Sequence, residues 1–395
     1  MKEPIAIQTH YPIRPEALAA PTSGIVEVYD YGRNRQGLLP LWVGEGDAST
    51  PSFITEAACA SLKAGETFYT YQAGWPSLRE AIAAYLTKMY RTPVSSERIF
   101  VTSGGMHALQ IAVNMVAGPG DVVLVPTPAW PNFRGALTVS GATPRDVPMQ
   151  FGDDGWQLDL NQLAAAVTPE TRALCINSPA NPTGWTATRD ELEFIIELAR
   201  THDLWIIADE IYGAFVYEGE RAPSFRDVMR ADDKVMFVQT FSKNWAMTGW
   251  RIGWLEAPQE LSETVVNLIQ YSSSGTPTSS QRAAIAALEG GVDFIAAQRQ
   301  LVITNRDLLI KAFKTEKSIR TAPPRGAFYL FFGVEGTLDT RQLAFDLVDQ
   351  ANVGLAPGTA FGSGGEGFLR LCFLRNTVDI AEAARRLVMT IRQRV

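Results

Sequence analysis

The sequence predicts an α/β protein with a large domain, built on a mostly parallel seven-stranded sheet flanked by helices, and a smaller α+β domain. Two observations lead to this prediction. Short apolar segments alternate with longer amphipathic ones between residues 99 and 272, and strands that alternate with helices pair mostly in parallel. After a long helical stretch over residues 279–313, strands and helices follow a different order.

The strand candidates of the large domain are short apolar segments, as expected for strands buried on both faces. They are Ile99–Thr102, Val122–Pro126, Thr143–Val147, Ala173–Ile176, Trp205–Ala208, Val235–Gln239 and Arg251–Leu255. The last candidate follows the sixth with only a loop between them, so it need not be parallel.

The helix candidates have apolar residues at helical spacing. They are Ser77–Met89, with Ser77 as the expected N-cap, and then Met106–Ala117, Pro131–Val139, Leu160–Ala166, Arg189–Thr201 and Pro258–Ser272. We expect the helical stretch 279–313 to break near Gly290-Gly291.

The small domain is predicted from the C-terminal pattern and from the Pro-rich N-terminus. Its expected elements are a strand at Gly326–Phe332, a helix at Thr340–Ala351, a strand at Gly367–Phe373 and a last helix at Val378–Arg394. Residues 1–40 contain one short amphipathic stretch, Ile25–Tyr31. We expect an N-terminal arm with part of the small domain over residues 1–47, the large domain over 48–285 and the rest of the small domain over 286–395.

Composition excludes several classes of protein. The net charge of -7 over 395 residues gives no basic patch for nucleic acid. Met1–Ala6 lacks the apolar core of a secretory signal, and no window is apolar enough to cross a membrane. Cys59, Cys175 and Cys372 indicate reduced thiols in or near the core, and therefore a cytoplasmic protein. No His/Cys cluster has metal-ligand spacing, so we expect no metal site.

Residues 240–253 carry the strongest chemical signal. Lys243 follows an apolar run, Ser242 precedes it, and Arg251 comes eight residues later between glycines. Lysine amines form Schiff bases with carbonyl compounds, and pyridoxal 5'-phosphate (PLP) is the cofactor that uses this reaction most. A hydroxyl and a guanidinium can hold its phosphate. Taken alone, Ser-Lys is more often a surface pair, and the surrounding motifs decide between the two interpretations.

Other polar groups follow the predicted strands at their carboxyl ends, where open α/β sheets bind ligands. Gly104 and Gly105 open a helix and favour an anion, whereas His107 is a site residue or a satisfied helix residue. Asp209 ends an apolar strand and needs a partner, which is either a protonated pyridine nitrogen or a basic side chain. Tyr212 could place its hydroxyl near the same ring.

Three further residues keep two interpretations each. Asn181 lies in a turn-rich loop, where it forms the turn or donates to a phenolate oxygen. Trp130 either packs in the core or stacks on a ring. Arg370, inside an apolar strand, faces a substrate carboxylate or a structural ion partner.

Together these motifs resemble the class I/II aminotransferases of fold type I, the PLP enzymes related to aspartate aminotransferase. The resemblance runs from about Ser23 to the C-terminus, with six motifs in the family's order. It implies that Lys243 carries the cofactor as a Schiff base and moves the proton between Cα and the cofactor. It also implies that Asp209 pairs with the pyridine nitrogen, and that Asn181 and Tyr212 contact the phenolic oxygen.

The resemblance assigns further residues. Trp130 matches the ring-stacking position, Gly44 and Arg370 match positions that hold the substrate α-carboxylate, and Tyr69 matches a tyrosine that reaches the neighbouring subunit's phosphate. The segment Ser103–His107 and the lysine motif supply the remaining cofactor-binding residues, which are Gly104, Gly105, Met106, Ser242 and Arg251. The resemblance therefore implies a homodimer in which each active site contains residues of both subunits.

The implied activity is ping-pong transamination between an L-amino acid and a 2-oxo acid. We expect neutral or aromatic substrates, because the segment Ala19-Ala20-Pro21 offers no cation for a distal carboxylate and Trp42, Trp75 and Trp130 could form an apolar pocket. Gly44-Glu45-Gly46-Asp47-Ala48 departs from the family's Gly-Glu-Pro-Asp-Phe and suggests a looser pocket mouth. The alternatives are a PLP-dependent β-elimination (C-S) lyase and, more remotely, a non-catalytic PLP-binding sensor.

Overall fold

A seven-stranded sheet forms the centre of the computed structural model, which describes residues 11–394. Residues 1–10, which include Met1–Ala6 and the start of the predicted arm, lie outside the described residues. The strands, in spatial order, are β2 Ile99–Thr102, β10 Gly253–Glu256, β9 Val235–Thr240, β8 Trp205–Asp209, β7 Thr171–Asn177, β3 Val122–Thr127 and β4 Thr143–Pro148. Only β10 runs antiparallel, against both β2 and β9, so the mostly parallel sheet is confirmed.

Helices cover both faces of this sheet. Successive side chains of a strand point to opposite sides, so strands that are apolar throughout have apolar side chains to bury on both faces. Val123 of β3 faces the core shared with α5 Gly105–Val116, α6 Pro131–Ser140 and α9 Ser262–Ser272. Leu124 faces the opposite core, shared with α7 Leu160–Ala165 and α8 Arg189–Thr201. A further core, under β2 and β10, is covered by α3 Ser52–Lys63, α4 Pro76–Tyr90 and α10 Thr278–Gly290.

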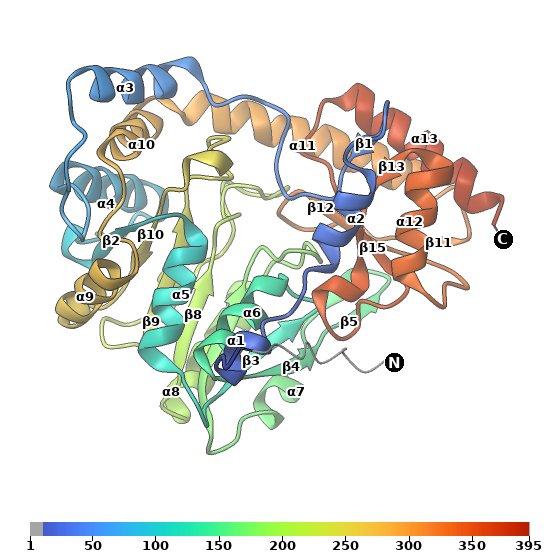
Figure 1. The fold of residues 1–395 in the computed structure, drawn as a ribbon. Helices are drawn as coiled ribbons and strands as arrows, with labels where there is room; N and C mark the ends of the chain where they lie inside the picture. Colours follow the sequence, from blue (N-terminus) through green and yellow to red (C-terminus); the bar gives the residue numbers. More distant parts are fainter. Residues whose placement is uncertain (1–10, 395) are drawn as a thin grey trace.

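The smaller sheet is antiparallel and belongs to a separate core. Its strands, in spatial order, are β11 Ile319–Arg320, β12 Tyr329–Val334, β15 Phe368–Cys372 and β14 Ala356–Pro357. Its core includes residues of α2 Gly24–Gly32, α11 Val292–Phe313, α12 Thr340–Ala351 and α13 Thr377–Arg392. In Figure 1, α11 crosses the top of the molecule toward the side where α2, α12 and α13 gather.

The remaining elements are short. They are α1 Pro15–Leu18, the parallel pair β1 Leu39–Pro40 and β13 Val353–Gly354, the hairpin β5 Gln150–Gly152 and β6 Gly155–Gln157, and 3₁₀ turns at Ser96–Arg98, Phe225–Asp227, Thr248–Trp250, Gln259–Leu261 and Gly358–Phe361. Among the described residues, no helix is both long and apolar enough to cross a membrane.

The structure corrects several sequence predictions. Ser77 is not the N-cap of α4: Trp75 holds that position, and Pro76 begins the helix, where its missing N–H is harmless. The predicted strand at Arg251 begins two residues later because Arg251 is left-handed (φ 51°), and the strand predicted from Gly326 begins at Tyr329, after Ala327 with φ 59°. Cys59 is exposed, and only the other two cysteines are buried.

Candidate active site

The carboxyl edge of the large sheet opens into a cavity of about 440 Å³. Parallel strands end at this edge, and the antiparallel β10 begins there, which brings Arg251 to the same place as Asp209. Most of the predicted site residues line the cavity, namely Gly44, Gly105, Met106, Trp130, Asn181, Asp209, Tyr212, Ser242, Lys243, Arg251 and Arg370. Gly104 and Tyr69 do not.

Lys243 is a buried amine in this cavity. It lies in the turn after β9, which the buried rings of Phe241 and Trp245 anchor to the core. Its Nζ donates a hydrogen bond to the carbonyl of Gly44 at 2.6 Å. Burial lowers the pKa of Lys243 to about 8, because the charged form loses its hydration. A substantial fraction of the amine is therefore unprotonated and nucleophilic near that pH.

Asp209 ends β8 next to Asn177 of β7 and is 1% exposed. Its carboxylate accepts one hydrogen bond, from the backbone N–H of Ile211 at 3.3 Å, and no Lys or Arg of residues 11–394 forms an ion pair with it. Burial raises the pKa of Asp209 to about 7. Because an unpaired buried charge is very unfavourable, this carboxylate suits a ligand that brings a protonated nitrogen.

An anion cradle lies where α5 begins. Gly104 has φ 90°, and a Cβ added to it would lie 2.6 Å from Nη2 of Arg251. The glycine therefore lets the guanidinium approach the amides at the helix N-terminus, although Gly104 itself lies behind the cavity lining. Ser242 Oγ accepts from Thr240 Oγ1 at 2.8 Å. A guanidinium, hydroxyls and helix amides fit a phosphate group.

Two phenols meet in the lining of the cavity. The hydroxyls of Tyr212 and Tyr329 are hydrogen-bonded at 2.8 Å. Burial raises the pKa of both phenols above the usual value of 10, so they stay neutral and can donate. A Cβ on Gly44 would lie 2.2 Å from the Tyr329 hydroxyl, which explains the glycine at that position. Tyr329 is a site residue that the sequence analysis missed.

Arg370 is a buried guanidinium without a carboxylate partner. It is 2% exposed, its Nη1 donates to Asn181 Oδ1 at 2.9 Å, and its Nη2 donates to the Trp42 carbonyl. Its Nε has no hydrogen-bond partner, and the guanidinium lies over the rings of Tyr329 and Phe361. The structural ion pair considered for Arg370 is absent from the described residues, and the free charge suits a substrate carboxylate.

The structure decides between the two interpretations of His107 and shows which tryptophan lines the cavity. His107 is a satisfied helix residue, since its Nδ1 accepts from Ser103 N–H at 3.1 Å and its Nε2 is hydrogen-bonded to Ser272 Oγ at 2.8 Å. Of the three tryptophans considered for the pocket, only Trp130 lines the cavity, and its ring also packs edge-on against a core phenylalanine. The lining residues not predicted for the site are Ile25, Val43, Glu45, Asn132, Ile211, Val238, Thr240, Thr248 and Tyr329.

Tyr69 does not line the cavity of its own chain. Its side chain is 95% exposed, and Phe68, Tyr71 and Tyr271 are also exposed. Tyr69 lines a separate hollow with residues 273–279. Among the described residues, Tyr69 therefore belongs to a different hollow from Lys243 and Asp209.

Comparisons with known proteins agree with this geometry. Residues 38–387 match the family model described as aminotransferase class I and II. An aspartate aminotransferase of Pyrococcus horikoshii is 31% identical over 95% of this chain and 96% of its own length. An aromatic-amino-acid aminotransferase of Thermococcus litoralis is 32% identical over 94% and 96%. The solved aspartate aminotransferase of Thermotoga maritima superposes with a TM-score of 0.90 at 31% identity, covering 96% of this chain and 100% of its own.

Replacing Asp209 with Asn should stabilise the cofactor-free protein while weakening its cofactor-dependent activity. The folded-state pKa of Asp209 is raised to about 7, so its ionisation destabilises the fold increasingly as pH rises from about 4 to 7. The gain in unfolding free energy should reach roughly 3–4 kcal/mol above pH 7 and shrink as pH falls toward 4. Urea unfolding at pH 5 and pH 8 measures it, and an equal effect at both values would contradict the burial argument.

Proposed function

The chain belongs to the class I and II aminotransferases, and we propose that it moves the amino group of an L-amino acid with a neutral or aromatic side chain to a 2-oxo acid, with PLP as its cofactor. One observation carries the proposal. A single cavity is lined by an amine with a lowered pKa, Lys243, by a buried carboxylate without an ion partner, Asp209, and by a buried guanidinium without an ion partner, Arg370. Neither charge has an ion-pair partner among the described residues.

The residues present fit PLP. Asp209 would hold the pyridine nitrogen, the cradle at Gly105 and Arg251 would hold the phosphate, and Lys243 would bond the aldehyde carbon. Asn181 and Tyr212 carry polar groups that can meet the phenolic oxygen. When bound, PLP supplies an aldehyde that condenses with amino groups and an electron-withdrawing ring.

Transamination needs a carboxylate clamp and a base at the substrate's Cα. Arg370 binds the α-carboxylate through its planar fork, and its hydrogen bonds to Asn181 and to the Trp42 carbonyl fix the guanidinium. With its amine free, Lys243 would take the Cα proton, because its pKa near 8 would let it gain and release a proton. The clamp positions the Cα–H bond toward that amine.

The charges around the cavity favour uncharged side chains. Lys243, Arg251 and Arg370 have roles already, and the nearby Arg134 forms an ion pair with Asp146. Within one subunit, no other Lys or Arg of the described residues lines the cavity, so a second carboxylate would find no cation there. The relatives' names do not decide this point, since both aspartate and aromatic-amino-acid aminotransferases are similar to the chain.

We also propose a cytoplasmic homodimer. In a dimer, the exposed Tyr69 would contact the phosphate bound in the other subunit. A second copy of the chain would also bury the exposed aromatic side chains near Tyr69. In the described residues the three cysteines are free thiols, which supports a reducing compartment. The division into residues 1–47, 48–285 and 286–395 stays a proposal, supported by the separate core around the smaller sheet.

Changing Lys243 to Ala should abolish transamination and remove the visible absorbance of covalently bound PLP, because no amine remains to bond the aldehyde. Product assays and absorbance spectra after reconstitution measure both effects. The control is Lys234→Ala, an exposed lysine paired with Asp203, which should keep both. Full turnover by the Lys243 variant would refute its role.

Neutral donors should react faster than acidic ones. We expect kcat/KM for L-phenylalanine to exceed that for L-aspartate by at least about tenfold, because the cavity offers no cation for a distal carboxylate. The loss of the cofactor's absorbance after mixing with each amino acid measures the half-reaction without an acceptor. Arg370→Met should slow both donors by similar factors, since both carry the α-carboxylate. A preference for aspartate would overturn the proposed specificity.

A mixed dimer tests whether Tyr69 acts in the partner's site. We expect Tyr69→Ala to weaken PLP binding and activity. Coexpression of this variant with Lys243→Ala should restore activity, because each mixed dimer then contains one site with both native side chains. If Tyr69 acted in its own subunit's site, no mixed dimer would have an intact site. Activity no higher than in the Tyr69 variant alone would therefore rule out a shared site.

A further inference from the structure

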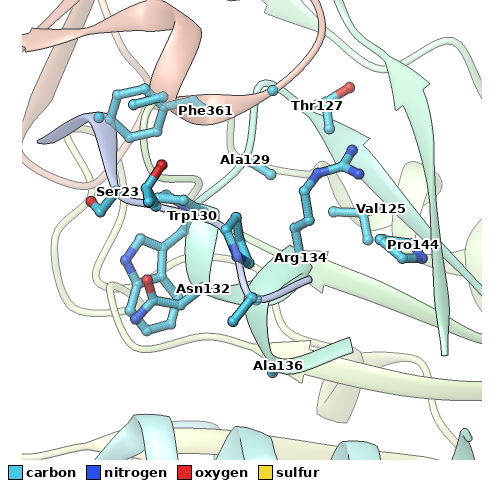
Figure 2. A pocket seen from close by; sticks show the side chains of 18 of the residues that line it. Ser23, Val125, Thr127, Ala129, Trp130, Asn132, Arg134, Ala136, Pro144 and Phe361 are labelled. Carbon is cyan, nitrogen blue, oxygen red and sulfur yellow. The ribbon is translucent and has the colours of Figure 1, made fainter. Parts of the chain in front are cut away.

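A second cavity, of about 550 Å³, lies beside the first. The two cavities share Met106, Trp130 and Asn132 as lining residues. The second extends between α6 and the segment Ala20–Gly24, which connects α1 to α2 and crosses its front in Figure 2. A volume of this size accommodates a large organic group.

The lining of the second cavity is mainly apolar, with polar side chains that include Gln110, Asn132, Arg134 and Asp146. The apolar lining residues include Pro21, Val125, Ala129, Ala136, Val139, Pro144 and Phe361. Figure 2 shows Arg134 extending from α6 toward Thr127. Arg134 is ion-paired with Asp146, which also accepts from Ser363 Oγ at 2.8 Å. Because this pair has no net charge, the cavity suits a bulky uncharged group.

Gly135 keeps this space open. It lies inside α6, where glycine is less stable than alanine by about 0.5–1 kcal/mol. A Cβ at this position would meet only Pro21 Cγ, at 4.0 Å. Neither packing nor a positive φ therefore requires a glycine here. At Gly354, by contrast, an added Cβ would lie 2.0 Å from the Trp42 ring. The missing side chain at position 135 has one visible consequence, which is the open volume.

We propose that the second cavity receives the side chain of the donor amino acid, and that Gly135 sets the largest side chain accepted. The inference rests on the proposed function, because Lys243 and Arg370 fix the amine and carboxylate of the donor in the first cavity. That cavity must also hold the cofactor, so a long side chain extends past Met106 and Trp130. The favoured donors have bulky, uncharged and mainly apolar side chains, such as that of L-phenylalanine.

Two variants of one residue test the proposal. Gly135→Leu should fill the cavity without loss of folding, because leucine is a better helix former than glycine. Its half-reaction with L-phenylalanine should slow at least about tenfold in kcat/KM, whereas that with L-alanine should stay within about twofold. Gly135→Ala, which adds only a Cβ, is the matched control and should leave both donors near wild type.

Equilibrium binding gives a second readout that needs no turnover. Calorimetric titration of the PLP-loaded protein with 3-phenylpropanoate and with propanoate should show weaker binding of the larger acid alone in the Leu variant. Equal losses for both acids, or for both donors, would overturn the role of Gly135, as would no loss at all. A wild-type protein that reacts with no amino acid would instead refute the proposed function.

Discussion

The structure depends on one constraint: a carboxylate, Asp209, and a guanidinium, Arg370, are buried in the same cavity and are not paired with each other. Asp209 and Arg370 are almost completely shielded from water, and each is oriented by hydrogen bonds to uncharged groups only. Isolated buried charges destabilise a fold by several kcal/mol each. The raised pKa of Asp209 and the lowered pKa of Lys243 have the same cause, which is the loss of hydration. A ligand that is cationic at one end and anionic at the other relieves both charges at once.

The fold holds these charges apart because they come from different sheets. Asp209 ends a strand of the large sheet, and Arg370 lies in the middle of β15 in the small antiparallel sheet. Segments far apart in the sequence connect them: Trp42 and Asn181 both accept hydrogen bonds from Arg370, and Tyr329 bonds to Tyr212. The relative position of the two sheets therefore sets the distance between Asp209 and Arg370, which the proposed function assigns to the cofactor and to the substrate carboxylate. Any substitution that shifts the small sheet should act on substrate binding before it acts on cofactor binding.

The sequence predicted the parts of this arrangement that depend on local patterns. Most strands of the large sheet follow from apolar runs, and several of these stop at a polar residue, as at Asp209; β4, with the sequence TPRDVP, is an exception. The helix α3 was not predicted, because it buries only Ile54, Ala58 and Ser61 and so has a weak apolar stripe. Tyr329 was missed for a different reason: in a strand whose residues are all buried, alternation does not reveal which side chain faces a cavity. Whether an arginine in such a strand has an ion partner is likewise a tertiary property, and Arg370 was settled only by the structure.

Open space is the property that local patterns predict least, and here it bears most on specificity. A cavity is formed by side chains that are absent, so its signal in a sequence is a small residue where a larger one would be more stable. Gly135 is such a residue: alanine would make the helix more stable, and its Cβ would meet only Pro21 Cγ, at 4.0 Å. The glycines at 44 and 104 differ, since a Cβ there would collide with site residues. Glycines that prevent a collision preserve the catalytic geometry common to the family, whereas a glycine that leaves a gap can vary without damage to the chemistry. If the second cavity receives the donor's side chain, as proposed, a substitution at position 135 should change substrate preference while the reaction itself is retained.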